Sequence, residues 1–260
     1  MRLPIYQVDA FADRRFAGNP AAVVPLDAWL PDATLLAIAA ENNLSETAFF
    51  VREGARHRLR WFTPATEVDL CGHATLATAH VMYTRLGAAP ARIEFESRSG
   101  VLAVDRDGDR IVLDFPAQAV APATVTSDMT AALGAAPVEA LANAQFLVAV
   151  LDSAARVREL APDLGRLRRL AAYGVTVTAP GEDCDFVSRH FAPNRGIDED
   201  PVTGSAHCRL MPYWAKRLGR TSLVARQLSR RGGTLWCELA VGRVRIAGHA
   251  VTYLEGAIEI

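Results

Sequence analysis

The sequence has no excess of charge of either sign. Its 28 Lys and Arg residues nearly balance 29 Asp and Glu residues, which gives a net charge of −1 at pH 7. A nucleic-acid or anionic-membrane partner normally requires a basic excess or patch, so neither partner is expected. The short arginine clusters within residues 166–169 and 230–231 are interpreted as solvated surface.

Cysteine is scarce, and long apolar runs are missing. The four cysteines form no CxxC pair and no disulfide-dense pattern, so we expect reduced thiols. No stretch is long and apolar enough to span a bilayer, and residues 1–6 lack the features of a signal peptide. These absences predict a cytoplasmic globular protein without a membrane segment.

Cofactor motifs are also missing from the sequence. It contains no HExxH, no P-loop and no clear GxGxxG, so nothing indicates a metal, a nucleotide or a flavin. Three histidines, His57, His190 and His249, have no ligand-like spacing. We interpret His80 as an ordinary helix residue and His207 as a packing residue close to a possible site.

The feature that organises the chain is an internal repeat. Residues 72–87 and residues 204–219 are equal in length, begin with Gly and end in Arg-Leu-Gly. Gly87 and Gly219 suit the left-handed residue that closes a helix, so each segment is predicted to be a helix. With about half of its 260 residues apolar, the chain can bury a sizeable core in one or two domains.

The repeat extends outward at nearly constant offset. Residues 62–64 match 191–193, and residues 96–100 match 228–232. Pro31-Asp32 and Pro162-Asp163 each begin a predicted helix, with Pro and Asp in favoured N-terminal positions. Predicted strands of the first half are 49–51, 58–62, 93–96, 101–104 and 111–115, and those of the second are 146–151, 175–177, 185–191, 222–226, 235–240 and 244–247.

This order of elements predicts an α+β protein of two similar lobes, residues 1–117 and 118–260. The last strand could return to the N-terminal lobe. The Ala-, Pro- and Thr-rich stretch 116–136 is interpreted as the linker. Duplicated lobes commonly hold a ligand in the cleft between them, so we expect one site there.

The two repeated helices begin at Gly72 and Gly204. A glycine lets a ligand approach the backbone, and the first-turn N–H groups favour an anion, so the pair predicts a site for a carboxylate substrate. The alternative is two ordinary strand-to-helix turns in which glycine serves close packing.

The residues beside these helix starts differ between the halves. With the glycines aligned, Cys71 falls opposite Thr203, and His73 falls opposite Ser205. His73 titrates near neutrality when unperturbed, and Ser205 could bind a substrate carboxylate. Asp200 precedes a proline, which favours an extended backbone that aims its carboxylate at the second helix start.

Glu46 is the remaining candidate, at the entry to an apolar strand. If it is buried, its pKa would rise toward the range of a general acid–base group. The alternative is an exposed glutamate at a strand edge.

Six segments, 8–11, 16–20, 43–47, 62–64, 67–75 and 200–207, span most of the chain. In these segments and in their order, the sequence resembles the PhzF family of phenazine biosynthesis-like proteins, which share a fold with diaminopimelate epimerase and proline racemase.

The resemblance implies two pseudo-symmetric lobes, each a β-barrel wrapped around a central helix, in a homodimer. It also implies a cofactor-independent isomerase that transfers a proton on a small carboxylated, cyclic or amino-acid-like metabolite. The family's catalytic residues fall on Glu46, His73 and Asp200. The expected substrate-binding residues are Asn19, Ser45, Gly72, Gly204 and Ser205.

Two other functions stay open. Epimerase relatives use one cysteine at each helix start, and Cys71 keeps the first such position while Thr203 occupies the second. A threonine hydroxyl is too weak an acid for that role, so an amino-acid racemase using Cys71 is the second candidate. Cys71 could be a low-pKa thiolate at its helix start or a packing residue. The third candidate is a non-catalytic small-molecule-binding protein.

Overall fold

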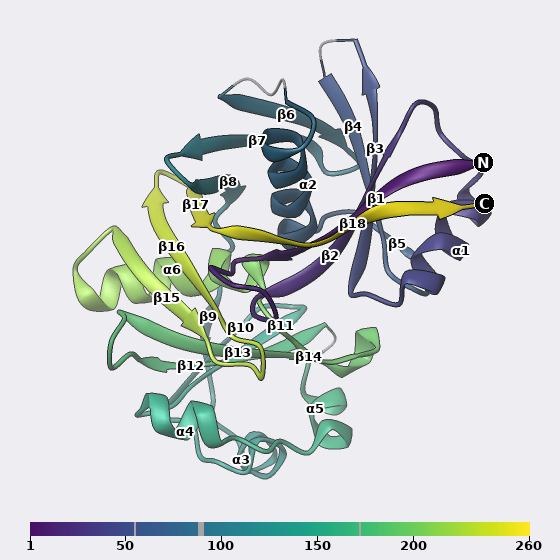
Figure 1. Cartoon of the computed structure of the whole chain (residues 1–260). Helices are drawn as coiled ribbons and strands as arrows, with labels where there is room; N and C mark the ends of the chain where they lie inside the picture. Colours follow the sequence, from purple (N-terminus) through teal and green to yellow (C-terminus); the bar gives the residue numbers. More distant parts are fainter. Residues whose placement is uncertain (55, 88–90, 172) are drawn as a thin grey trace. The chain divides into compact units, whose positions relative to one another are not determined.

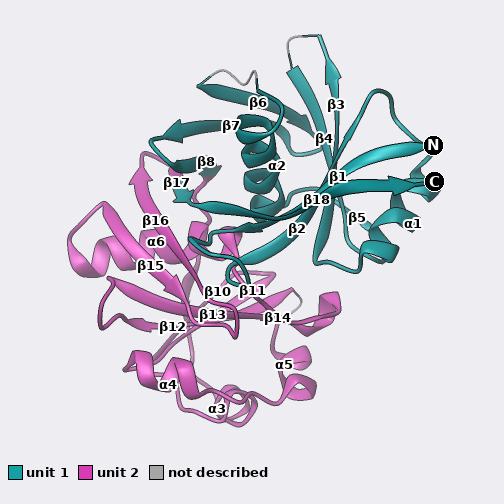
Figure 2. Cartoon of the chain, viewed as in Figure 1, with its two compact units in different colours: residues 1–115, 245–260 teal, residues 116–244 magenta. Residues whose placement is uncertain are grey.

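The computed structural model describes residues 1–54, 56–87, 91–171 and 173–260, and its elements are drawn in Figure 1. The chain divides into two compact units (Figure 2). Unit 1 comprises Met1–Phe115 and Arg245–Ile260, and unit 2 comprises Pro116–Val244.

Unit 1 takes its elements from both ends of the chain. They are β1 (Arg2–Ala10), β2 (Asn19–Leu26), α1 (Asp32–Asn42), β3 (Glu46–Glu53), β4 (Arg56–Phe62), β5 (Glu67–Val68), α2 (Gly72–Thr84), β6 (Arg92–Ser97), β7 (Gly100–Asp107), β8 (Arg110–Pro116) and β18 (Ala250–Glu259). The last strand, β18, pairs with β1 in antiparallel register from Arg2↔Glu259 to Ala10↔Ala250.

Unit 2 is continuous in sequence. Its elements are β9 (Ala121–Ala123), α3 (Ser127–Leu133), β10 (Glu139–Ala142), β11 (Phe146–Val150), α4 (Ala154–Glu159), α5 (Leu164–Leu170), β12 (Gly174–Pro180), β13 (Phe186–Ala192), the short 3₁₀ helix η1 (Pro193–Arg195), β14 (Ile197–Asp200), α6 (Gly204–Leu218), β15 (Ser222–Gln227) and β16 (Gly233–Ala240). Strand β17 (Arg243–Gly248) begins in unit 2 and ends in unit 1.

The strand pairings repeat between the units. In unit 1, β2 pairs in parallel with β3, β3 is antiparallel to β4, and β4 pairs in parallel with β6 across helix α2. In unit 2, β11 is parallel to β12, β12 is antiparallel to β13, and β13 is parallel to β15 across α6. The repeated helices of the sequence are therefore the crossover helices of two equivalent parallel strand pairs.

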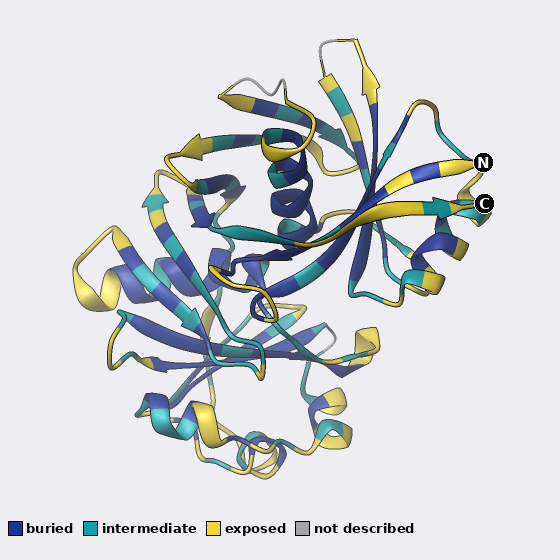
Figure 3. Cartoon of the chain, viewed as in Figure 1, coloured by how far each residue is buried: buried dark blue, intermediate teal, exposed yellow. Residues whose placement is uncertain are grey.

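Helix α2 is buried along most of its length (Figure 3). Its buried residues include Ala74, Leu76, Ala77 and Val81, and it contacts strands β1, β2, β3 and β18. Small and apolar side chains on all sides are typical of a helix that strands surround. Each unit also has its own apolar core, one around Leu35 and Phe49 and the other around Leu147 and Val177.

Most predicted element positions are confirmed, with shifted ends. The predicted helices 72–87 and 204–219 are α2 and α6, and Gly219 closes α6 in the left-handed conformation. Helix α2 instead ends at Thr84, and its cap is Arg85. Asp163 caps α5 by accepting a hydrogen bond from the backbone N–H of Arg166, and Pro31 precedes α1.

The predicted linker 116–136 is wrong. This stretch forms β9 and α3, and β9 pairs with β10 in unit 2. Its Ala-, Pro- and Thr-rich composition favours a loop locally, but the pairing with β10 and the Thr126 cap of α3 order it. Within the described residues, no helix is both long and apolar enough to cross a membrane.

Candidate functional site

Glu46 and His73 form a buried pair in unit 1. Glu46 is the first residue of β3 and His73 lies in the first turn of α2. His73 Nε2 lies 3.1 Å from Glu46 Oε2, and both residues are less than one-tenth exposed. The contact lacks hydrogen-bond geometry, so charge attraction rather than a directed bond connects the two atoms. The exposed alternative considered for Glu46 is wrong.

Asn19 and Ser45 orient the His73 ring. The Ser45 hydroxyl lies 3.4 Å from Asn19 Oδ1 and donates to it, and Asn19 Nδ2 lies 3.2 Å from His73 Nδ1. Because an amide NH₂ group can only donate, Nδ1 accepts, and the proton of the neutral ring lies on Nε2, facing Glu46. A doubly protonated ring directs its Nδ1 proton toward Cys71 Sγ, 3.5 Å away.

The loop from β1 to β2 places Asn19. Gly18 has a φ of +65°, and a Cβ there would lie 2.2 Å from the carbonyl oxygen of Ala10, so only glycine fits this turn. The buried Asp9 side chain accepts a 2.9 Å hydrogen bond from the backbone N–H of Phe16 and holds the loop from inside.

The pair changes the acid–base chemistry of His73. Burial alone would lower the pKa of His73, but the interactions of its ring with Cys71 and with the Glu46 carboxylate outweigh burial and raise the pKa well above its ordinary value of 6.5. Burial and the nearby Glu46 charge raise the pKa of the Cys71 thiol to about 11. Cys71 is therefore a neutral thiol at pH 7, and the low-pKa thiolate considered from the sequence is wrong.

The same three side chains could hold a metal ion. The ligand atoms of Glu46, Cys71 and His73 all lie within 4.8 Å of one another. Carboxylate, thiolate and imidazole ligands in this number suit Zn²⁺ with one open position. A metal there would occupy the lone pairs that acid–base chemistry needs, so the two uses of the site exclude each other.

The start of α2 is free of a side-chain cap. Cys71 is the N-cap residue, and its side chain makes no capping hydrogen bond. A Cβ at Gly72 would only make ordinary contact with Phe115, at 3.6 Å, and the backbone there is not left-handed. Neither packing nor conformation thus requires this glycine, and its first-turn N–H groups suit an anion.

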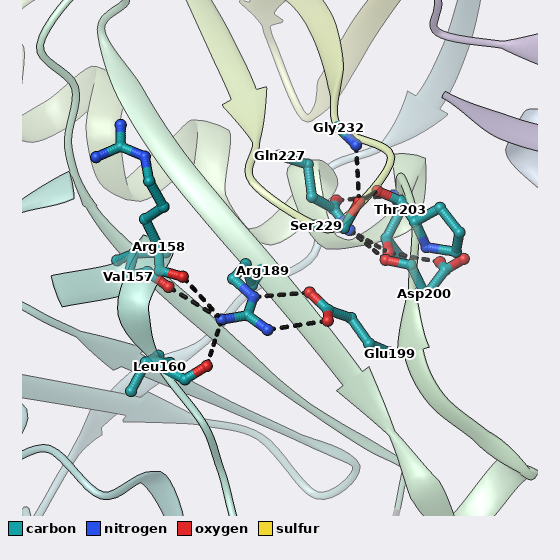
Figure 4. Close-up of polar contacts among 11 residues, drawn as sticks. Val157, Arg158, Leu160, Arg189, Glu199, Asp200, Thr203, Gln227, Ser229 and Gly232 are labelled. Carbon is teal, nitrogen blue, oxygen red and sulfur yellow. Dashed lines mark hydrogen bonds and ion pairs between the residues drawn. The ribbon is translucent and has the colours of Figure 1, made fainter. Parts of the chain in front are cut away.

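A second set of polar groups lies in unit 2, at the start of α6 (Figure 4). Thr203, the N-cap residue, donates its hydroxyl to Asp200 Oδ2 at 2.5 Å. Gln227 Oε1 accepts from the Thr203 backbone N–H at 2.8 Å, and Gln227 Nε2 donates to the Asp200 carbonyl at 2.6 Å. The buried Gln227 side chain therefore fixes the backbone of Asp200 and that of Thr203 relative to each other.

Neighbouring contacts hold this turn in place. Arg189 makes a two-pronged ion pair with Glu199, the residue before Asp200, and its third nitrogen donates to backbone carbonyls, including that of Leu160 at 2.7 Å (Figure 4). Ser229 donates to the carbonyl of Pro201 at 2.7 Å. The carboxylate of Asp200 thus sits on a rigid turn rather than on a loose loop.

His207 supports the same turn from inside the helix. Its Nδ1 lies 2.8 Å from the Thr203 carbonyl, and its ring is fully buried. Burial lowers the pKa of His207 to about 4, so the neutral ring donates the Nδ1 proton. Ser205 follows Gly204 in the first turn and is partly exposed.

The structure thus places the predicted residues in two sets. Asn19, Ser45, Glu46, Cys71 and His73 meet in unit 1. Asp200, Thr203 and the helix start at Gly204 and Ser205 lie in unit 2. Gln227 was not among the predicted residues, because its only signal in the sequence is a polar residue next to the repeated segment 228–232.

Comparisons with known proteins place the chain among named relatives. The profile of the family described as "phenazine biosynthesis-like protein" matches residues 8–256. An uncharacterized isomerase of Pseudomonas aeruginosa is 55% identical over the full length of both chains. An uncharacterized isomerase of Halalkalibacterium halodurans is 42% identical over 99% of each chain.

Solved structures agree in fold. A PhzF-family protein of Enterococcus faecalis has a TM-score of 0.98 at 48% identity, with all of both chains covered. A hydroxyproline epimerase of Agrobacterium vitis has a TM-score of 0.61 at 12% identity, over 99% of this chain and 92% of that one, and shares the fold alone. The family resemblance and the α+β epimerase-like fold class inferred from the sequence are confirmed.

Proposed function

The chain belongs to the family of phenazine biosynthesis-like proteins and is an isomerase, and we propose that it moves a proton between two carbon atoms of a small carboxylated metabolite without a cofactor. Glu46 is the acid–base group in this proposal. The observation that carries it is the buried contact of 3.1 Å between Glu46 and His73. A carboxylate buried beside a histidine of raised pKa is an arrangement typical of proton-transfer sites.

The proposed reaction balances with one proton and no net change in composition. The Glu46 carboxylate takes a proton from a substrate C–H bond, and the electron pair enters the conjugated system of the substrate. Protonated Glu46 then returns the proton to another carbon on the same face. Protonated His73 stabilises the negative charge that develops between the two steps.

Substrate binding is assigned to the uncapped helix starts and the polar groups beside them. The first-turn N–H groups at Gly72 and Gly204 suit a carboxylate, and Ser205 can add a hydroxyl donor. Asp200, held by Thr203, can accept from a substrate hydroxyl or amino group. That both sets bind one substrate, in a cleft shared by the two units, comes from the sequence and stays a proposal.

The two alternatives from the sequence receive less support. A two-thiol racemase needs a readily ionised thiol at each helix start, whereas the pKa of Cys71 is about 11 and Thr203 holds the equivalent position. A non-catalytic binding protein does not need a buried acid–base pair, and the curated relatives named above are isomerases.

The test is solvent deuterium exchange. Wild-type protein in D₂O is incubated with a panel of small cyclic and amino-acid carboxylates, and incorporation of deuterium into carbon is followed by NMR. Glu46→Gln should lower the exchange rate by roughly 10²–10⁴-fold, the usual effect of losing an acid–base group. Glu41→Gln, on the exposed end of α1, is the matched control and should exchange normally.

Two outcomes would overturn the proposal. Exchange by Glu46→Gln at the wild-type rate would remove Glu46 from the reaction. Loss of wild-type exchange on EDTA treatment, with recovery on adding Zn²⁺, would instead assign Glu46, Cys71 and His73 to a metal.

A further inference from the structure

Arg209 in helix α6 is a buried cation with unsatisfied donors. It is 1% exposed, and its Nε and Nη2 atoms have no hydrogen-bond partner among the described residues. Two arginines with little exposed side chain, Arg60 and Arg189, have carboxylate partners: Arg60 pairs with Glu67 at 2.8 Å and Arg189 pairs with Glu199 at 2.7 Å. Burying an unpaired cation is unfavourable, so an anion bound to this guanidinium would stabilise it.

Among the described residues, two contacts compensate Arg209 in part. The guanidinium carbon lies 3.6 Å from the centroid of the Phe146 ring, a cation–π contact. Nη1 donates to Gln118 Oε1 at 2.5 Å. Burial lowers the pKa of Arg209 to about 10, and no carboxylate opposes that effect. A neutral amide oxygen therefore occupies the position where a carboxylate would bind more strongly.

A pocket of about 600 Å³ lies at this point, wholly within unit 2. Arg209, Pro212, Tyr213 and Lys216 line it at the spacing of one helix face. Because Pro212 has no N–H, the Cys208 carbonyl is left without its helical donor and accepts from the backbone N–H of Gln118 at 3.0 Å instead. That hydrogen bond holds the segment before β9 against α6. Residues of this segment line the pocket opposite the helix.

The lining combines apolar and basic residues. Ala119, Val120, Pro122, Leu141 and Pro212 supply apolar surface. Arg209, Lys216 and Arg217 supply three positive charges against the single carboxylate of Glu139, which already contacts Arg217 and Tyr213. Lys216 is exposed and has no ion-pair partner among the described residues.

We propose that this pocket binds a small organic oxyanion with an apolar body, whose carboxylate or phosphate replaces Gln118 as the acceptor for Arg209 and is also neutralised by Lys216. The volume is that of an ordinary small-molecule site. None of the residues of this pocket belongs to the acid–base site, so the proposal stands independently of the proposed reaction.

The chain offers a direct probe, because Lys216 is its only lysine. The full-length protein is acetylated with a limiting amine reagent, with and without benzoate, and modification is quantified by mass spectrometry. At a benzoate concentration ten times the dissociation constant, occupancy of about 90% should slow acetylation of Lys216 by about tenfold. The Met1 amine is the internal reference and should react unchanged.

Two variants and one control locate the effect. Ala119→Trp places a large ring from an exposed wall position into the pocket and should abolish the protection by benzoate. Arg209→Gln should reduce the affinity for benzoate by at least about tenfold, since a charge-assisted contact is worth about 1.5–3 kcal/mol. Arg168→Gln removes a charge from exposed α5, outside the pocket, and should leave the protection intact. If Arg209→Gln does not fold, Ala119→Trp decides the question.

Four results would contradict the proposal, and the first three concern Lys216 and Ala119→Trp. One is no protection of Lys216 at any benzoate concentration, and a second is protection that Ala119→Trp leaves unchanged. The third is protection of Lys216 without benzoate in a dimer that Ala119→Trp dissociates, which would assign the pocket to a second copy of the chain. Inorganic phosphate distinguishes the ligand source, because phosphate that protects as well as benzoate would contradict the apolar body.

Discussion

At the residue scale, the charge of His73 depends on its contact with Glu46. The pKa of His73 rises because its interactions with Cys71 and Glu46 outweigh burial, and since Cys71 is a neutral thiol at pH 7, the Glu46 carboxylate is the charged partner. Glu46→Gln should therefore lower the pKa of His73 to below its ordinary value, because burial then dominates. An NMR titration of the ring protons in both proteins measures the shift, and an unchanged His73 pKa would contradict the pairing.

The same pair predicts how stability depends on pH. A histidine whose pKa is raised on folding contributes stability that is fully present below its unfolded value, about 6.5, and is lost as the pH rises through the folded value. The difference in unfolding free energy between wild type and His73→Gln should thus be larger at pH 6 than at pH 9. Urea unfolding at both pH values tests this, and an equal difference at both would contradict it.

Cys71 gives a separate prediction, which distinguishes the proposed reaction from the racemase. Its thiol is buried and its pKa is about 11, so iodoacetamide should modify it slowly at pH 7. Cys71→Ser should retain isomerase activity, with a loss well below the roughly 10²-fold expected for an acid–base group. Rapid alkylation at pH 7 together with loss of α-carbon exchange in Cys71→Ser would favour the racemase instead.

The candidate residues could be named from the sequence, but their burial and their contact partners could not be predicted from it. Whether a glutamate at the start of an apolar strand is exposed or buried depends on which elements pack against it. For Glu46 this element is α2, whose His73 contacts it only in the folded chain. The contact between Asn19 and His73 joins residues far apart in the chain, so no local pattern could reveal which of them orients the other. The low-pKa thiolate was wrong because burial and Glu46 outweigh the helix start at Cys71.

At the element scale, the turn from β14 into α6 depends on Gln227 at the end of β15. This side chain satisfies the Thr203 N–H and the Asp200 carbonyl, both beside the second helix start. Gln227→Leu should destabilise the protein by about 1–3 kcal/mol, since it leaves buried groups without partners.

The same variant should also lower kcat, because the Asp200 carboxylate loses its fixed position. Gln227→Glu, which keeps an acceptor for Thr203, should lose less activity than Gln227→Leu. Urea unfolding and steady-state kinetics on both variants separate the two effects. A normal kcat in Gln227→Leu would show that the position of the Asp200 carboxylate does not matter for the reaction.

The internal repeat explains why so many elements could be predicted. It aligns Cys71 with Thr203, and these residues are the N-caps of α2 and α6. The prediction failed where the signal is tertiary: β9 has only three residues and is ordered by pairing with β10. Strand β14 was not predicted for a similar reason. Its four residues, Ile197–Asp200, are mostly charged, and pairing with β13 determines their conformation.

At the scale of the whole molecule, unit 1 is closed by the two ends of the chain. Strand β1 lies between β2 and β18, so its backbone groups pair on both sides. Strand β1 also leads into the loop that carries Asn19 to His73. Completion of the acid–base site therefore depends on the last residues of the chain, although none of them touches Glu46 or His73 in the contacts described above.

Deleting residues 249–260 should consequently unfold unit 1 and leave unit 2 intact. Losing the β1–β18 ladder removes several hydrogen bonds worth about 0.5–1.5 kcal/mol each, a sum comparable with the roughly 5–15 kcal/mol that stabilises a whole domain. Limited proteolysis should then degrade residues 1–115 first and leave a resistant fragment near 116–244. Deletion of Ile260 alone is the control and should change little, since it removes only the backbone contacts of Ile260 with Met1 and leaves β18 whole. Equal protease resistance of the deletion variant and wild type would show that β1 holds its place without β18.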